Sequence, residues 1–487
     1  MSDALQQARL DKLNALRSMG IDPYPARVPP TDPIGPITVR FDGLKDEEHS
    51  GHNVTVSGRL MAHRGMGKAS FLDLQDGTGK IQAYATVDHL NEAYDLLSHI
   101  DVGDILSVTG EVFRTKRGQL SVDATQLVLL SKSIRPLPEK WHGLKDVEIR
   151  HRHRSLDLIS NAAVRETFVT RSKILASVRQ TLNAEGFLEV ETPVLLLIPS
   201  GGHAQPFQTH HNALDADMYL RIALELYLKR VMIGGIDRVY ELGKCFRNEG
   251  VSTEHNPEFT MLEIYQAYTD VEGMMALAER IILNALDALG NEQTVTFGDL
   301  TIDFSPPWRR VTMIDAVAEA LSIDAGALRT EKALDLCRDR GIDPVPGTPG
   351  EAITALFERF VEDTLVRPTF VTDYPVEVSP LAKRSPSDDG LVERFELFAA
   401  GIELANAFTE LNDPVDQRAR FDAQEALRAL GDEEAQRIDE DFLYALEHGM
   451  PPAGGMGMGV DRLVMMLTGE TSIRDVILFP TLRRKDE

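Results

Sequence analysis

The sequence predicts an α+β protein in which a small β-barrel precedes a larger domain of helices and strands. At 487 residues the chain is too long for one ordinary domain. Its 43% apolar and 26% charged residues are typical of a globular protein, which excludes a disordered or fibrous chain. Short alternating runs fill residues 52–130, whereas the residues beyond about 160 mix helical periodicity with strands of clear alternation. Two folding units of different character follow from these patterns.

The N-terminal segment, residues 1–50, is predicted to be a short helix and a linker. Leucines at helical spacing lie among polar residues, and Gly20 and a cluster of prolines end the pattern. The strands expected next are residues 54–56, 71–74, 81–84, 105–108 and 127–130, with Asp76-Gly77 marking a hairpin. Five short strands predict a barrel over 51–135, and five-stranded barrels of the OB type bind oligonucleotides. A purely structural β-domain is the alternative.

The distribution of charge and the number of cysteines bear on two questions: whether the protein binds nucleic acid, and whether its compartment is reducing. The net charge of -25 opposes nucleic-acid binding, but Lys and Arg balance Asp and Glu between residues 51 and 160, at 14 against 13. Only two cysteines occur, Cys245 and Cys337, without metal-ligand spacing, which indicates a reducing environment. No apolar stretch approaches the ~20 residues of a membrane span, and the N-terminus lacks a signal-peptide core. We expect a cytoplasmic location and no membrane partner.

A connector is predicted over 136–160, followed by the larger domain over 161–487. The connector contains a basic run, residues 150–154, which a polyanion could contact or which could be an ordinary solvated loop. Beyond it, apolar residues at helical spacing between Val164 and Leu182 predict a long helix that Gly186 ends.

The most informative segment is residues 239–265, interpreted as two strands joined by the loop 250–257. A period of two places Arg247 and Glu249 on one face of the first strand. It places Phe259, Glu263 and Tyr265 together on the second. Because burying such charges unpaired is costly, this surface is predicted to receive a ligand that has both charge and a flat ring.

Alternation recurs in residues 401–411, where Asn406, Phe408 and Glu410 share a face. Glu396 and Glu403 are seven apart, so they share a face only if residues 399–401 bend the strand. Together they could form a carboxylate pair for Mg²⁺. Acidic residues on a solvated strand are the alternative.

A glycine-rich run, residues 454–459, precedes an apolar helix with Arg462 in its first turn. The glycines allow close backbone approach to a bulky group, although a tight turn explains an isolated run equally well. The spacing fits neither a phosphate-binding P-loop nor a dinucleotide fingerprint.

In order and spacing, these segments resemble the three signature motifs of class II aminoacyl-tRNA synthetases: residues 186–193 end motif 1, residues 246–259 form motif 2 and residues 457–462 form motif 3. Within that class the chain is most similar to the lysine-specific family, through residues 209–215, 218–223, 225–230, 255–260 and 473–480. The resemblance runs over nearly the whole chain. It implies an OB-fold anticodon domain, an antiparallel catalytic sheet flanked by helices, and a homodimer formed largely through motif 1.

The resemblance also implies a reaction: lysine is adenylated by ATP with release of pyrophosphate, and then transferred to the 3′ end of tRNA(Lys). It implies that Arg247 binds the α-phosphate and the lysine carboxylate, and that Phe259 and Arg462 enclose the adenine. The implied catalytic residues are Arg247 and Arg462, and the implied ATP-binding residues are Arg247, Glu249, His255, Asn256, Phe259 and Arg462. Glu396 and Glu403 match the Mg²⁺ carboxylates of the family.

The implied lysine-binding residues are Gly201, Glu225, Glu263, Tyr265, Asn406, Phe408 and Glu410. By family likeness, Glu410 and Tyr265 hold the side-chain ammonium and Glu225 lies near the α-amino group. An aspartyl or asparaginyl enzyme of the same subclass is an alternative, but an anionic substrate would require a cation where Glu410 stands. In the barrel, Arg64, Phe71 and Gln82 match residues that contact the anticodon, where an aromatic ring stacks on a base.

Three positions depart from the family pattern: Gln205 replaces a common arginine, Leu224 a usual proline and Glu254 a basic residue. The last departure matters most, because an acidic side chain near the ATP triphosphate would repel its negative charge. The alternative function is a synthetase-like protein that has lost charging and serves as a tRNA-binding or regulatory module. Loss of a motif arginine or of a Mg²⁺ carboxylate would favour it, and Arg247, Arg462, Glu396 and Glu403 are all present.

Overall fold

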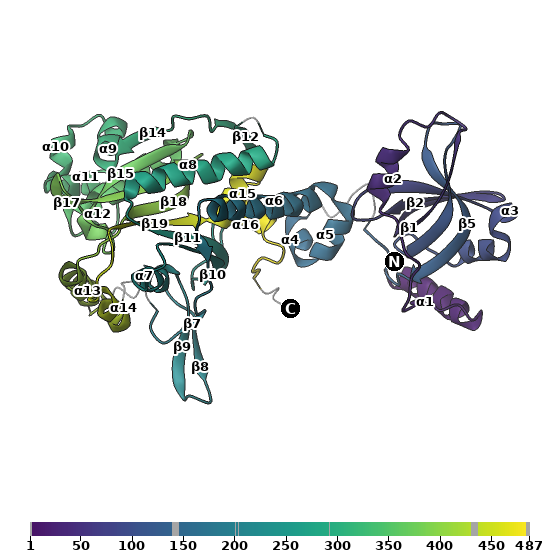
Figure 1. Ribbon diagram of the computed structural model, residues 1–487, viewed down its shortest axis with the longest axis horizontal. Coiled ribbons are helices and arrows are strands. Elements are labelled where there is room, and N and C mark those ends of the chain that lie inside the picture. Colours follow the sequence, from purple (N-terminus) through teal and green to yellow (C-terminus); the bar gives the residue numbers. More distant parts are fainter. Residues whose placement is uncertain are drawn as a thin grey trace. The chain divides into compact units, whose positions relative to one another are not determined.

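The computed structural model describes residues 2–138, 146–199, 201–202, 204–291, 293–429 and 437–483 (Figure 1). The chain divides into two compact units, Met1–Gly143 and Leu144–Glu487. None of the helices in these described ranges combines the length and apolar character needed to cross a bilayer.

The first unit is a closed five-stranded barrel, which confirms that prediction. Its strands pair in the order β1-β2-β3-β5-β4, and only the β3–β5 pair is parallel. The strands are β1 (His49–Met66), β2 (Ala69–Gln75), β3 (Lys80–Thr86), β4 (Ile105–Arg114) and β5 (Leu120–Ser131). Alternate residues such as Leu72, Leu74 and Ile81 fill the interior. The predicted N-terminal helix is α1 (Ser2–Ser18); the other helices are α2 (Ile34–Arg40), α3 (Val87–Leu90) and η1 (Asn91–Ser98).

The second unit is built on a nine-stranded sheet whose path is β14-β15-β17-β18-β19-β11-β10-β6, with β16 paired to β17. It is antiparallel except at its two edges, where β14–β15 and β10–β6 are parallel. The strands are β6 (Leu188–Glu189), β10 (Arg238–Phe246), β11 (Glu258–Ala267), β14 (Arg309–Thr312), β15 (Thr369–Pro375), β16 (Arg384–Ser385), β17 (Asp388–Ala399), β18 (Ile402–Thr409) and β19 (Ala453–Gly459).

Helices cover one face of this sheet and leave part of the other face open. The covering helices are α6 (Ala162–Ala184), α8 (Val271–Ala288) and α15 (Val460–Thr468), and Figure 1 shows α6 and α8 running along the sheet. On β11, Leu262 and Ile264 pack in their core, so the intervening residues face the opposite side. There α7 (Glu225–Ile233) and α14 (Glu440–Leu446) form a second core with β10 and β11. The α+β prediction is therefore confirmed.

The remaining elements surround the sheet. Near its β14–β15 edge, α9 (Met313–Leu321), α10 (Ala325–Leu328), α11 (Lys332–Asp339) and α12 (Pro349–Phe360) share a third core. Small sheets are formed by β7 (Leu195–Leu196), β8 (Gln208–His211) and β9 (Ala216–Leu220), and by β12 (Thr294–Phe297) and β13 (Leu300–Asp303). The other helices are α4 (Val147–Arg152), α5 (Arg154–Ser160), η2 (Glu362–Thr364), η3 (Val376–Val378), α13 (Pro414–Ala429) and α16 (Ile473–Val476).

The basic run in the predicted connector is not a solvated loop. Residues 139–145 lie outside the described residues, but 147–152 form α4 and 154–160 form α5. Arg154 is fully buried, pairs with Asp157 at 2.7 Å and donates to the carbonyl of Leu478 at 2.9 Å. His151 lies 3.0 Å from Asp475. Carboxylates and carbonyls of the second unit therefore bind the side chains of Arg154 and His151.

Candidate active site

A cavity of about 960 Å³ opens on the sheet face opposite α8. Strands β11, β17, β18 and β19 line it, together with the loop after β10 and residues of α12. It contains most of the predicted catalytic-domain residues: Gly201, Glu225, Arg247, Glu249, His255, Asn256, Phe259, Glu263, Tyr265, Glu396, Glu403, Asn406, Phe408 and Arg462. Glu410 is fully buried just beyond the end of β18.

Arg247 enters the cavity from a loop and not from a strand. The expectation that Arg247 and Glu249 share a strand face was wrong, because β10 ends at Phe246. The amide of Arg247 donates to the carbonyl of Pro257 at 3.0 Å, which closes the base of the loop. Its guanidinium lies 5.2 Å from the centroid of the Phe259 ring, and its Nε is buried without a hydrogen-bond partner among the described residues. A cation beside an aromatic plate is thus available to a ligand.

Arg462, in the first turn of α15, lies beside Glu403 and His255. Its Nη1 donates to the Glu403 carboxylate at 2.9 Å, and its Nη2 lies 3.5 Å from His255 Nε2. His255 Nδ1 lies 3.0 Å from the Ser252 hydroxyl. Asn256 lines the cavity, but its amide group bonds to backbone: it donates to Glu258 at 2.6 Å and accepts from Thr481 at 3.0 Å. Asn256 therefore also anchors the loop.

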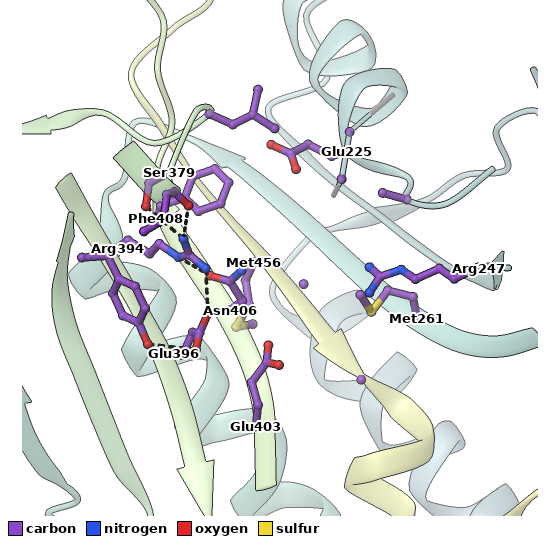
Figure 2. Close-up of a pocket in the computed structure, with 18 of the residues that line it drawn as sticks. Glu225, Arg247, Met261, Ser379, Arg394, Glu396, Glu403, Asn406, Phe408 and Met456 are labelled. Carbon is purple, nitrogen blue, oxygen red and sulfur yellow. Dashed lines mark hydrogen bonds and ion pairs between the residues drawn. The ribbon is translucent and has the colours of Figure 1, made fainter. Parts of the chain in front are cut away.

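Glu396 and Glu403 approach the cavity from neighbouring strands, not from one bent strand as expected. A turn at Ala400 and Gly401, both with positive φ, joins β17 to β18 as a hairpin. A register shift after Leu397 then brings the two glutamates to the same side (Figure 2). Like charges this close disfavour ionisation, and the pKa of Glu396 is raised mainly by burial and also by Glu403.

Arg394 and Tyr374 hold Glu396 in place. Arg394 donates to one carboxylate oxygen at 2.7 Å (Figure 2). The Tyr374 hydroxyl donates to the other at 2.8 Å. Arg394 also donates to Asn406 at 3.0 Å. Two neighbouring carboxylates are a donor set that suits Mg²⁺ when phosphate oxygens complete its shell. Within the described ranges, no group of three or more ligating side chains could hold an ion unaided.

At the other end of the cavity, four acidic or phenolic side chains meet. Glu263 accepts from the amide of Leu224 and from the Tyr265 hydroxyl, each at 2.9 Å. Burial, and then the charge of Glu225, raise the pKa of Glu263 to about 7. Burial also raises the pKa of Glu410 to about 8, against the opposing charge of Lys229. The site thus concentrates acidic side chains in a dry environment.

Lys229 is the internal cation of this cluster. Its Nζ lies 2.5 Å from Glu225 and pairs with Glu410 Oε2. Within the described part of the chain, Glu410 Oε1 has no hydrogen-bond partner. A Cβ added at Gly455 would lie 1.9 Å from this oxygen and 2.5 Å from Cε1 of Tyr265. Since Gly455 lines the cavity, its missing side chain leaves room for the carboxylate and the ring.

The glycine-rich run is therefore a central strand, β19, and not a tight turn. The predicted helix with Arg462 follows it as α15. Leu224, where proline is usual, supplies an N–H to Glu263 that proline lacks. Glu254 is exposed at the cavity rim, and the backbone carbonyl of Gln205 accepts from Asn248 at 2.8 Å.

In the barrel, the three predicted anticodon residues lie on the outer surface of β1, β2 and β3. Arg64 forms a bidentate pair with Asp73, at 2.8 and 2.7 Å. The Phe71 ring lies 5.0 Å from Tyr84, and Gln82 accepts from Ser121 at 3.2 Å. Phe71 and Tyr84 form an aromatic surface flanked by polar groups, which suits stacking of bases.

Sequence reasoning missed Lys229, Tyr374 and Arg394. Lys229 follows Glu225 by four residues, so a helical pair could have been suspected. Arg394 and Glu396 share a face of β17 at a spacing of two. Tyr374 contacts Glu396 across neighbouring strands, and no local sequence pattern indicates that contact.

Comparison with known families agrees with this geometry. The family model of class II tRNA synthetases (D, K and N) matches residues 146–483, and that of the OB-fold nucleic acid binding domain matches residues 54–130. The chain therefore contains a class II tRNA synthetase domain preceded by an OB-fold domain.

Relatives along the whole chain define the family more narrowly. The chain is 54% identical to a lysine–tRNA ligase of Moorella thermoacetica, over 99% of this chain and 98% of the relative. It is 52% identical to that of Carboxydothermus hydrogenoformans (99% and 98%) and 49% identical to that of Bacillus subtilis (100% and 98%). The chain belongs to the lysine–tRNA ligase family.

Proposed function

We propose that this protein activates L-lysine with ATP and transfers it to the 3′ end of tRNA(Lys). The observation that carries this proposal is the buried oxygen of Glu410, which faces Gly455 without a partner among the described residues. An unpaired carboxylate oxygen in a dry pocket favours a ligand with a cation at that point. It rejects uncharged analogues, since they leave it unpaired.

Charge balance supports lysine over an anionic amino acid. Glu225, Glu263 and Glu410 surround one internal cation, Lys229. Lysine brings two ammonium groups, and we assign its side-chain group to Glu410 and Tyr265 and its α-amino group to Glu225 and the backbone at Gly201. Asn406, Phe408 and Glu263 complete the wall. Aspartate or asparagine would leave this charge uncompensated.

For adenylation we assign phosphate and carboxylate binding to Arg247 and adenine binding to Phe259 and Arg462. Glu249, His255 and Asn256 complete the ATP site. An oxygen of the lysine carboxylate attacks the α-phosphorus, a new P–O bond forms, and the bond to pyrophosphate breaks. No side-chain nucleophile is needed, because positioning and charge neutralisation supply the rate acceleration.

We assign Mg²⁺ binding to Glu396 and Glu403. The carboxylate donors fit a hard cation that also takes phosphate oxygens. When bound, the ion neutralises charge on the triphosphate. Arg394 and Tyr374 orient Glu396 for this task through the hydrogen bonds described above.

For tRNA we assign anticodon contacts to Arg64, Phe71 and Gln82, and we infer a cytoplasmic location, where tRNA is charged. We further propose a homodimer through motif 1. The segment from β6 to residue 198 exposes several large apolar side chains, and a second copy of the chain would cover them. They are Leu188, Val194, Leu195, Leu197 and Ile198.

Amino-acid-dependent exchange of pyrophosphate into ATP tests the proposal. Purified protein with Mg²⁺ is assayed with lysine, ornithine, aspartate and asparagine, without tRNA. We expect exchange with lysine alone. Exchange with aspartate or asparagine would contradict the pocket assignment, and no exchange with any of the four would favour a tRNA-binding protein without catalysis.

A further inference from the structure

Lys229 is a fully buried cation at the far end of the lysine pocket. Its ammonium contacts Glu225, four residues earlier on α7, and Glu410, beyond the end of β18. The rings of Phe408 and Phe442 cover it, with centroids 5.4 and 5.9 Å away. One side chain therefore bridges the two carboxylates that we assign to the two ends of the substrate.

We propose that Lys229 is a positioning residue for lysine recognition: it fixes the orientation of Glu410 so that one oxygen is held internally and the other is presented to the substrate ammonium. This inference rests on the proposed function. Oε2 of Glu410 pairs with Lys229, whereas Oε1 points toward Gly455 on the cavity wall. Without Lys229, nothing described on α7 would choose between the two oxygens.

A second role follows from the same contacts, because the charge of Lys229 favours the ionised form of Glu410 against the effect of burial. The groups that face it are Glu225 and Glu410, and Glu410 is in turn faced by Glu263 and Tyr265 of β11. Burial opposes the charge of Lys229, but its two carboxylates outweigh burial and raise its pKa. Removing the ammonium would take away the charge and the hydrogen bond by which Lys229 lowers the pKa of Glu410, so that pKa would rise further.

The test compares Lys229→Met with the unchanged protein in lysine-dependent pyrophosphate exchange, from pH 6.5 to 9.5. We expect the KM for lysine to rise at least 100-fold at pH 7.5, while the KM for ATP changes less than threefold. The pH above which the lysine KM levels off should move upward by about one unit. An unchanged KM for lysine, or equal losses for lysine and ATP, would overturn the proposal.

Lys229→Arg keeps the positive charge that the buried carboxylates require, so this variant should fold even if the methionine variant does not. Arginine places that charge on a side chain of different shape. We expect its KM for lysine to lie between those of Lys229→Met and the unchanged protein. A lysine KM equal to that of the unchanged protein would overturn a positioning role, because any buried cation would then suffice.

The barrel supplies a matched control. Lys132 is another fully buried lysine, paired with Asp101 and Asp104 at 2.6 and 3.0 Å. Lys132→Met should lower the melting temperature without raising the KM for lysine in exchange. The same rise in both variants would show a general loss of folding and overturn the proposal. Absence of lysine exchange in the unchanged protein would instead refute the proposed function itself.

Discussion

Single residues at the lysine end of the cavity carry the amino-acid specificity that we propose. Glu410 is buried, shares one oxygen with Lys229 and leaves the other without a partner in the described part of the chain. Removing one partner of a buried ion pair costs about 3–5 kcal/mol of folding stability. Substitution here should therefore lower the stability of the fold as well as change substrate choice, so each variant is also compared by thermal unfolding.

Glu410→Gln should raise the KM for lysine at least 100-fold, because the amide is neutral toward the substrate ammonium. ATP binding should remain nearly unchanged, since Arg247 and Phe259 lie elsewhere in the cavity. Pyrophosphate exchange with varied lysine and equilibrium binding of ATP measure the two effects. Equal loss of both would remove Glu410 from its assigned role.

The pH dependence of lysine use should follow Glu410. Its pKa is raised to about 8 by burial, so the carboxyl group is largely neutral below that pH. An ammonium binds the charged form, and below pH 8 binding must first release a proton. The KM for lysine should therefore rise about tenfold for each unit below pH 8 and level off above it. Steady-state exchange from pH 6 to 9.5 measures this, and Glu410→Gln should flatten the profile.

At the scale of elements, three connected strands build the site: the β17–β18 hairpin presents the carboxylates and β19 forms the floor between them and β11. The glycines of β19 differ in how closely neighbours approach. A Cβ at Gly455 would lie 1.9 Å from Glu410, whereas at Gly457 the nearest atom would be 3.8 Å away. Alanine substitutions at these two positions of one strand therefore form a matched pair for comparison.

Gly455→Ala should abolish most lysine-dependent exchange, because the methyl group must displace Glu410 or Tyr265. Gly457→Ala places its methyl at an ordinary contact distance and should keep activity within about threefold. Kinetics and thermal unfolding of both variants distinguish the site from the strand. Similar loss in the two would mean that alanine disturbs β19 generally.

Sequence alone predicted the elements whose signals are local. Alternation located the five barrel strands, and it placed Phe259, Glu263 and Tyr265 on one face of β11. Alternation gave wrong predictions where the backbone leaves the regular strand conformation. The loop at Arg247 and the turn at Ala400–Gly401 depend on pairing between strands, and the contact of Lys229 with Glu410 joins residues far apart in sequence. Individual roles at the site came from family resemblance and not from the pattern.

At the scale of the whole molecule, the residues that we assign to amino-acid activation and those that we assign to anticodon contacts belong to different compact units. Every residue of the cavity lies between 201 and 473, and the barrel ends at Ser131. Each unit has a hydrophobic core of its own. Amino-acid activation and tRNA recognition should therefore be separable by substitution.

Phe71→Ala should raise the KM for tRNA in the charging reaction and leave pyrophosphate exchange without tRNA unchanged. Loss of one base stacked on an aromatic ring costs about 1–3 kcal/mol, or roughly 5- to 150-fold. Val39, an exposed apolar residue of α2, provides a control, because Val39→Ala should change neither assay. An effect of Phe71→Ala on exchange would place it outside the assigned role.

The glycine floor also limits how this scaffold can evolve. Neither Gly454 nor Gly455 has space for even a methyl group, since a Cβ at Gly454 would lie 2.8 Å from the carbonyl of Asp270. Substitutions at these two positions therefore cannot change the size of the pocket in small steps. A descendant that accepts a different amino acid must change the walls, β11 and β18, while inheriting the floor.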